Sequence, residues 1–240
     1  MNRNSESRFA TAPVSLDIGR STFNRDSEVK MTGNVGDLCC FYVDEVLPGD
    51  TFQVKTSKVA RLQTLLTPIM DNVYMDFYWF YVPNRLVWNH WKEFMGENNQ
   101  SAWVPSTTYT VPQVTAPSGG WSVGTIADQM GLPVGLGNIS VSALPVRAYA
   151  LIVDQWFRSE VLQNPVNVPD GDSTTAGSNG TNYINDLAKG GMPFVVNRPF
   201  DYFSAALPEP QKGNDVPIPV SSNAQIPIYS LSTNVPEQEL

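Results

Sequence analysis

The amino-acid sequence predicts a mainly β fold with long loops, and three features of its composition lead to that prediction. The chain has 240 residues, and its 19 prolines and 17 glycines favour turns over long helices. Charged residues make up only 16% of the chain, below the share of about a quarter that is usual in soluble domains. Hydrophobic residues make up 42%, which is enough for a sizeable core. We therefore expect many short strands, long irregular connections and few helices.

Residues 73–82 form the strongest strand candidate, and the rest of the chain is expected to pack around it. Apolar side chains occupy both alternating sets of positions, interrupted only by Asp76. A strand that is apolar on both faces needs cover on both faces, as in the middle of a packed sheet. Pro83 ends this strand because it has no N–H to donate. The spacing of the following apolar residues then predicts a short helix at 84–96, with Asn84 as its N-cap.

The N-terminal residues 1–36 are predicted to form an extended arm that lies on another surface. They are polar and carry few large apolar side chains, so they bury little on their own. A frayed terminus is the alternative. They also lack the apolar core of a secretory signal, and the longest apolar run, at 77–82, is too short to span a bilayer. We therefore expect a soluble protein that is not exported and has no membrane partner.

A second strand is predicted at residues 51–59, after a turn at 47–50. Lys55, Lys58 and Arg61 form a small basic cluster near the end of this strand. The cluster is either a solvated strand face or a contact for phosphates or another acidic partner. The net charge of −8 argues against a protein that grips nucleic acid with its whole surface, so any such contact must be local.

The residues that follow the first predicted helix are expected to be mostly loops with two further helices. Residues 97–121 are rich in Asn, Ser, Thr and Pro, which is typical of a surface excursion. A short helix is predicted at 122–130, with Ser122 as its N-cap. Apolar residues at three- and four-residue spacings predict a longer helix at about 145–163, with Pro145 in its first turn.

Patterns typical of catalysis and of metal binding are missing from the sequence. Cys39 and Cys40 are adjacent and would point to opposite faces of a strand, so both are expected to stay reduced. His90 is the only histidine, and a packing role is expected for it within its helix. The loop at 167–182 contains two aspartates but lacks the distal glutamate of a calcium-binding loop. We expect a protein that is not an enzyme and binds no cofactor or metal.

A non-catalytic carbohydrate-binding β-sandwich is the alternative function that the composition leaves open. Six tryptophans can line a sugar cleft, and acidic residues beside the predicted strands can supply the paired carboxylates of a glycosidase. The Asp44–Glu45 pair, however, lies at a strand end before a turn, where acidic side chains are simply solvated. Sugar binding without hydrolysis is therefore the stronger form of this alternative, and it predicts a monomer.

Several stretches of the sequence resemble the major capsid proteins of the small single-stranded DNA bacteriophages, the Microviridae, and above all the gokushovirus branch. The stretches are residues 43–52 (VDEVLPGDTF), 67–72 (TPIMDN), 82–88 (VPNRLVW), 94–97 (FMGE), 147–149 (RAY), 156–158 (WFR), 201–203 (DYF), 207–208 (LP) and 210–213 (PQKG). A weaker match is residues 20–23 (RSTF). Together they cover most of residues 20–220 in the expected order, which makes the resemblance specific.

The resemblance implies a viral jelly-roll β-barrel with long loop insertions that carry short helices. It also implies a T=1 icosahedral shell around a circular single-stranded DNA genome, assembled in the cytoplasm of a bacterial host. Residues 37–240 would then be the N-terminal part of one capsid domain, with insertions at about 97–220. Family members are longer than this chain, so the chain would correspond to an N-terminal half and the barrel in it would be incomplete. Glu209 stands where the family leads us to expect an aromatic residue.

A capsid protein acts through interfaces, and the resemblance turns two groups of residues into candidate contact sites. Trp103, Tyr109 and Trp121 lie on the first excursion and are predicted to be exposed anchors between subunits. The basic cluster is predicted to face the interior and the packaged DNA. Because the chain is acidic, a small basic DNA-binding protein of the virus would do part of that work. The other implied partners are minor capsid or spike proteins and a receptor on the bacterial surface.

Overall fold

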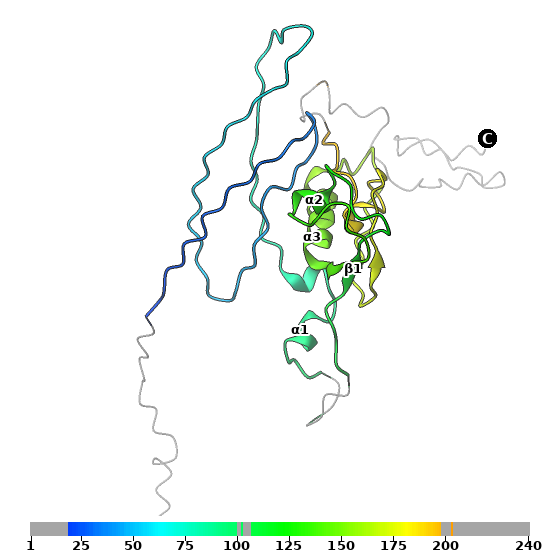
Figure 1. The fold of residues 1–240 in the computed structure, drawn as a ribbon. Coiled ribbons are helices and arrows are strands. Elements are labelled where there is room, and N and C mark those ends of the chain that lie inside the picture. Colours follow the sequence, from blue (N-terminus) through cyan, green and yellow to red (C-terminus); the bar gives the residue numbers. More distant parts are fainter. Residues whose placement is uncertain (1–18, 100–101, 103–106, 198–202, 204–240) are drawn as a thin grey trace, which may run out of the picture.

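Figure 1 shows the chain as a computed structural model, which describes residues 19–99, 102, 107–197 and 203. Residues 19–82 form a long meander of extended segments, and the described residues after Pro83 form a body of short helices around a small sheet. The meander lies beside the body for part of its length and extends well beyond it (Figure 1). No helix among these residues combines the length and the apolar content that crossing a membrane would require.

The meander consists of four extended segments that run in alternating directions. Its extended segments are residues 19–33, 38–46, 51–66 and 72–82. Two of its turns are closed by backbone hydrogen bonds, since the N–H of Asp37 donates to the carbonyl of Asn34 and that of Asp50 to Leu47. The Leu47 turn was expected from its proline and glycine, and Gly49 there has a φ of 85°, which favours glycine.

Side chains, rather than a backbone ladder, hold the segments of the meander together. Arg25 forms an ion pair with Asp44. The ring of Phe41 meets Phe77 edge-on with centroids 5.5 Å apart, and it meets Trp79 in the same way at 5.4 Å. These contacts place the fourth segment beside the second.

The strands predicted at 51–59 and 73–82 are extended but do not form a sheet. No backbone hydrogen bond joins one described segment of the meander to another. The expected cover is also missing, because Tyr74 and Tyr81 are 82% and 72% exposed and the apolar residues around them are exposed as well. Alternation in the sequence predicts an extended backbone, whereas a ladder also needs a second backbone within hydrogen-bonding reach. Edge-on aromatic side chains join the fourth segment to the second instead, and Lys58 of the third segment lies over the ring of Phe77.

The body contains short elements in the following order: η2 (Asn84–Leu86), α1 (Trp91–Phe94), β1 (Gln113–Thr115), α2 (Ile126–Gln129), β2 (Ser140–Ser142), α3 (Leu144–Ile152), η3 (Val153–Phe157), β3 (Thr175–Ala176) and η4 (Leu187–Lys189). β1 is the central strand of the sheet, antiparallel to β2 and parallel to β3. A small mixed sheet with few and short helices agrees with a mainly β fold class.

The three predicted helices are found, but each is shorter than its sequence pattern suggested. The first consists of two separate turns, η2 and α1, and Asn84 lies inside η2 without acting as its cap. The second is α2, capped by Thr125 and not by Ser122, because the Thr125 hydroxyl accepts the N–H of Asp128. The third is α3, which has Pro145 in its first turn as expected and continues as the π-helical turn η3 only to Phe157.

The core of the body surrounds α3. Buried residues of α3 and of the first position of η3 pack with side chains from β1, α2, η4 and the loops. They are Val146, Tyr149, Ala150 and Val153 on the helix side, and Val114, Trp121, Ile126, Leu187 and Phe194 around them. The Tyr149 hydroxyl donates to the carbonyl of Leu38 at 2.7 Å and accepts the N–H of Phe194 at 3.1 Å. Its burial raises the pKa of this phenol. Tyr149 therefore joins the base of the meander to the body.

Candidate interaction surfaces

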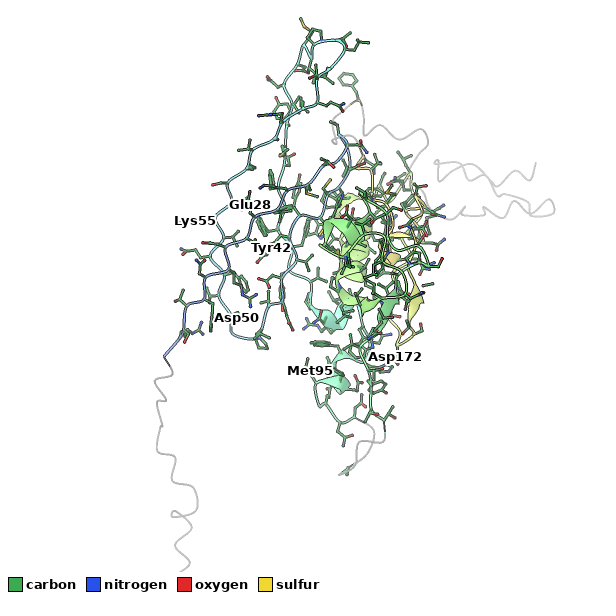
Figure 2. The ribbon with its side chains drawn as sticks, in the orientation of Figure 1. Glu28, Tyr42, Asp50, Lys55, Met95 and Asp172 are labelled. Carbon is green, nitrogen blue, oxygen red and sulfur yellow. The ribbon has the colours of Figure 1, made fainter. Side chains whose placement is uncertain are left out.

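The basic cluster lies on the third segment of the meander, and all three of its side chains are exposed. Figure 2 places Lys55 at the outer edge of the meander, away from the body. Lys58 differs from the other two, because its Nζ lies 3.5 Å from the centre of the Phe77 ring in a cation–π contact. The three predicted residues therefore lie on one segment, and the side chains of Lys55 and Arg61 are accessible to a partner from solvent.

The three aromatic residues predicted as exposed subunit anchors have three different outcomes. Trp103 lies outside the described residues. Tyr109 is partly buried and stacks on His90, with ring centroids 4.2 Å apart and planes inclined by 13°. The prediction for Trp121 was wrong, because its side chain is only 1% exposed and belongs to the core.

Trp121 is buried because the excursion returns to the body at this residue. Its Nε1–H donates to the carbonyl of Lys189 at 3.2 Å. Glycines make room for the indole, since a Cβ atom at Gly190 would lie 3.0 Å from Nε1 and one at Gly177 would lie 3.1 Å from the ring. The polar composition of residues 97–121 therefore predicted a surface excursion, but the last residue of this stretch, Trp121, is buried.

A polar clasp joins the first helical turns of the body to the loop before β3. The carboxylate of Asp172 accepts the indole N–H of Trp88 at 2.6 Å, and His90 Nδ1 lies 2.9 Å from both of its oxygens. The hydrogen bonds from Trp88 and then His90 lower the pKa of Asp172. The backbone adds a further link, because the N–H of Asn89 donates to the carbonyl of Asp170 at 3.0 Å. We refer to this set of contacts as the clasp.

The clasp gives His90 a positioning role. Asp172 is engaged by the indole and the imidazole together, and both contacts tie the link between η2 and α1 to the loop before β3. Among the described residues, no group of three histidine, cysteine, aspartate or glutamate side chains is arranged to hold a metal ion. The aspartates of the 167–182 loop, which failed as a calcium site in the sequence, thus serve the packing of the body.

Arg147 on α3 is the residue that sequence reasoning missed. Its side chain is fully buried, and Nη1 donates to the carbonyl of Val87 at 3.1 Å and to that of Gly171 at 2.9 Å. Burial lowers the pKa of this guanidinium, and the nearby carboxylates of Asp170 and Asp172 partly oppose that effect. The one available signal was a charged residue in the middle of an apolar helical pattern.

A groove also runs between the arm and the body. It encloses about 800 Å³ and is lined by residues from the arm, the second segment and the end of α2, including Val29, Met31, Phe41 and Met130. Its walls are mixed in polarity, with Glu28, Lys30 and Asp128 beside the apolar side chains. Like the meander, it presents apolar surface that the described residues leave uncovered.

The comparisons with known proteins agree on one family. Residues 12–239 match the family model described as "Capsid protein (F protein)". Capsid protein VP1 of Bdellovibrio phage phiMH2K is 39% identical over 235 residues, which are 98% of this chain and 42% of that protein. Capsid protein VP1 of Chlamydia phage 1 is 39% identical over 95% of this chain and 40% of its own length. For capsid protein VP1 of Spiroplasma virus 4 the values are 37%, 91% and 39%.

The chain thus spans less than half the length of the curated relatives that it matches. The match nevertheless includes both the meander and the body, so it does not rest on one local motif. On this basis, the chain belongs to the phage F capsid protein family.

Proposed function

We propose that this protein is a major capsid protein, a structural subunit that assembles with copies of itself into the shell of a phage virion. The observation that carries the proposal is the similarity to capsid protein VP1 of Bdellovibrio phage phiMH2K over 98% of the chain. A shell protein acts by burying surface against copies of itself under closed symmetry, and this requires no catalytic group. The absence of catalytic motifs from the sequence is compatible with such a role.

The meander supports a jelly-roll barrel as the fold of the assembled subunit. Its four segments run back and forth as antiparallel strands do, and alternate positions in the fourth are apolar on both faces. Neighbouring strands would supply hydrogen-bond partners for this extended backbone, and a covering layer would bury its exposed apolar faces. In this proposal residues 1–36 are the arm and residues 37–240 belong to one barrel domain. Most of the body, from β1 to η4, then lies within the insertions at about 97–220.

The family resemblance supports the finer features of the assembly. They are a T=1 icosahedral shell, a circular single-stranded DNA genome and assembly in the cytoplasm of a bacterial host. The proposed partners are copies of the chain, minor capsid or spike proteins, small basic DNA-binding proteins and a receptor on the host surface.

Electron microscopy of the protein expressed from its complete gene tests this function. We expect closed particles of a single diameter. The rival function, a carbohydrate-binding β-sandwich, predicts monomers that are retained on a glycan array. Size-exclusion chromatography of the same sample separates the two outcomes, and a monomer that binds glycans would overturn the capsid proposal.

The exposed lysine and arginine of the third segment are proposed to face the packaged genome. A subunit with a net charge of −8 cannot neutralise DNA over its whole surface, so local cationic positions have to supply any direct contact. Lys55 and Arg61 are suited to this role because both are exposed, whereas Lys58 also contacts Phe77.

Reversing the charge of Lys55 and Arg61 together is expected to lower the amount of DNA packaged per particle severalfold while shells still form. Each cation that contacts a phosphate contributes favourable, salt-dependent binding free energy, and a glutamate there repels the phosphate instead. The measurement is the ratio of absorbance at 260 and 280 nm of purified particles, together with DNA extracted per particle.

The matched control is the pair Arg85→Glu and Lys92→Glu, which makes the same change in net charge at exposed positions of the body. This control is expected to package DNA normally. If both double variants packaged the same amount of DNA, the proposal that the basic cluster faces the packaged genome would be wrong.

A further inference from the structure

An uncharged aromatic patch lies where the fourth segment of the meander meets the end of α3. Trp156 is 70% exposed, the most exposed tryptophan among the described residues, and Tyr81 is 72% exposed. These two side chains and Leu86 surround a small pocket whose walls are completed by Phe80, Leu151 and Ile152. No charged side chain lines this pocket. We call these residues the Trp156 patch.

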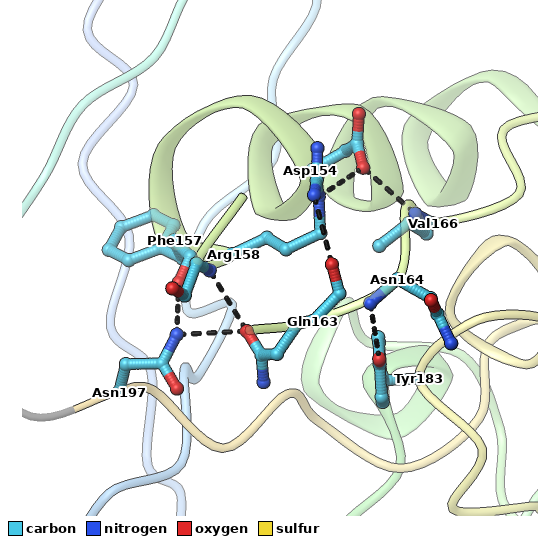
Figure 3. Close-up of polar contacts among 9 residues, drawn as sticks. Asp154, Phe157, Arg158, Gln163, Asn164, Val166, Tyr183 and Asn197 are labelled. Carbon is cyan, nitrogen blue, oxygen red and sulfur yellow. Dashed lines mark hydrogen bonds and ion pairs between the residues drawn. The ribbon is translucent and has the colours of Figure 1, made fainter. Parts of the chain in front are cut away.

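The backbone beneath Trp156 is firmly held. α3 widens into the five-residue π-helical turn η3, a rare geometry that is frequent at functional sites. Asp154 Oδ1 accepts both the Nε–H of Arg158 and the N–H of Val166, each at 2.8 Å. The side-chain amide of Asn197 donates to the carbonyl of Phe157 at 3.2 Å and to Gln163 at 2.9 Å (Figure 3).

The neighbouring side chain, Phe157, is less exposed than Trp156. Phe157 packs against the meander, with its ring 5.5 Å from Tyr78 and 6.0 Å from Phe80. The Trp156 ring also contacts Phe80, with centroids 5.8 Å apart, but most of its surface stays in solvent, whereas Phe157 is half-buried. A rigid scaffold that presents an exposed tryptophan and tyrosine around a pocket has the composition of an interface hot spot.

Charge identifies the partner that fits this patch. Two copies of a chain with a net charge of −8 repel each other over most of their surfaces, so contact is least costly where no charge is present. Asp154 and Arg158, which lie two positions before and after Trp156, form an ion pair with each other and add no net charge. An uncharged patch on an acidic protein is thus better suited to a second copy of the same chain than to DNA or a strongly acidic partner.

We propose that the Trp156 patch is a contact between neighbouring copies of this chain, with Trp156 as its anchor. The proposal rests on the proposed capsid function and deepens it by naming one subunit interface. Trp156 takes the role that the sequence suggested for Trp121, which is buried.

The test compares Trp156→Ala with the wild type, both expressed from the complete gene. Two quantities are measured: the protein concentration at which particles appear in sedimentation, and the thermal unfolding midpoint of the unassembled subunit. We expect the threshold concentration to rise at least about tenfold, since hot-spot side chains typically contribute that much or more. The unfolding midpoint is expected to stay unchanged, because the indole is exposed in the subunit. Trp156→Phe, which keeps an apolar ring, should restore part of the loss.

Leu162→Ala is the matched control, because Leu162 is 65% exposed on the same body but does not line the pocket. It is expected to assemble like the wild type. Normal assembly of Trp156→Ala would overturn the interface alone and leave the capsid function standing. A lowered midpoint of the unassembled Trp156→Ala subunit would also overturn it, since the patch would then be covered by the subunit's own chain. A wild type that forms no particles would overturn both proposals.

Discussion

Replacing Trp121 by alanine is expected to lower the free energy of unfolding of the body by about 3–5 kcal/mol, the usual cost of truncating a buried aromatic side chain. The indole is 1% exposed and packs with α2, α3 and η4 in the main core. Its loss opens a cavity that neighbouring glycines cannot fill, because Gly177 and Gly190 line the ring without side chains. It also leaves the carbonyl of Lys189 without the indole N–H. A loss of this size is a large part of the stability of a typical domain.

Urea unfolding followed by far-UV circular dichroism, at low protein concentration, measures this loss without using tryptophan fluorescence. Trp156→Ala removes the same side chain from an exposed position and is expected to change the free energy of unfolding by no more than about 0.5 kcal/mol. Trp121→Phe should fall between the two, since it keeps most of the ring but loses the hydrogen bond. Equal effects at Trp121 and Trp156 would show that burial of Trp121 does not stabilise the body.

The sequence predicted local features of this fold well. Side-chain patterns identified two of the extended segments of the meander, at 51–59 and 73–82. Proline and glycine identified the turn at 47–50, and helical spacing located α3 with its first-turn proline. Each of these features is set by residues within a few positions of one another. Helix ends were less predictable, because the cap of α2 depends on which of two nearby hydroxyls meets a free N–H.

The location of the core could not be predicted in the same way. The most apolar stretch, residues 73–82, is largely exposed, and the main core around α3 lies within the region predicted to be insertions. Apolar content shows that a segment needs cover, but it does not show which residues supply that cover. In the proposed capsid the cover of the meander comes from partners outside the described residues. The body, by contrast, satisfies its own apolar residues around α3.

Long-range polar contacts were also beyond the sequence. Asp172 lies 82 positions after His90, and nothing in either local pattern pairs the two. The clasp could be found only when the fold brought the loop before β3 to the first helical turns of the body. The same holds for Trp121, whose surroundings come from η4 and from glycines more than fifty positions away.

Arg147 links these long-range contacts, and its replacement by alanine is expected to destabilise the body by about 3–5 kcal/mol. The guanidinium bonds to both segments that the clasp joins, through the carbonyls of Val87 and Gly171. Alanine would leave a cavity at a fully buried position and two carbonyls without their donor. The packing of η2 and α1 against the loop before β3 should loosen as a result.

Arg147→Met separates the two causes of this effect. Methionine refills much of the volume and removes a buried charge, so its cost should be clearly smaller than that of alanine, and the difference reports the cavity. The destabilisation that remains in Arg147→Met reports the loss of the hydrogen bonds. It is reduced by the free energy gained because a charge is no longer buried. Hydrogen exchange at the amide of Asn89, which donates to Asp170 across the clasp, should accelerate in both variants. If neither variant changes the free energy of unfolding or this exchange rate, Arg147 does not hold the clasp together.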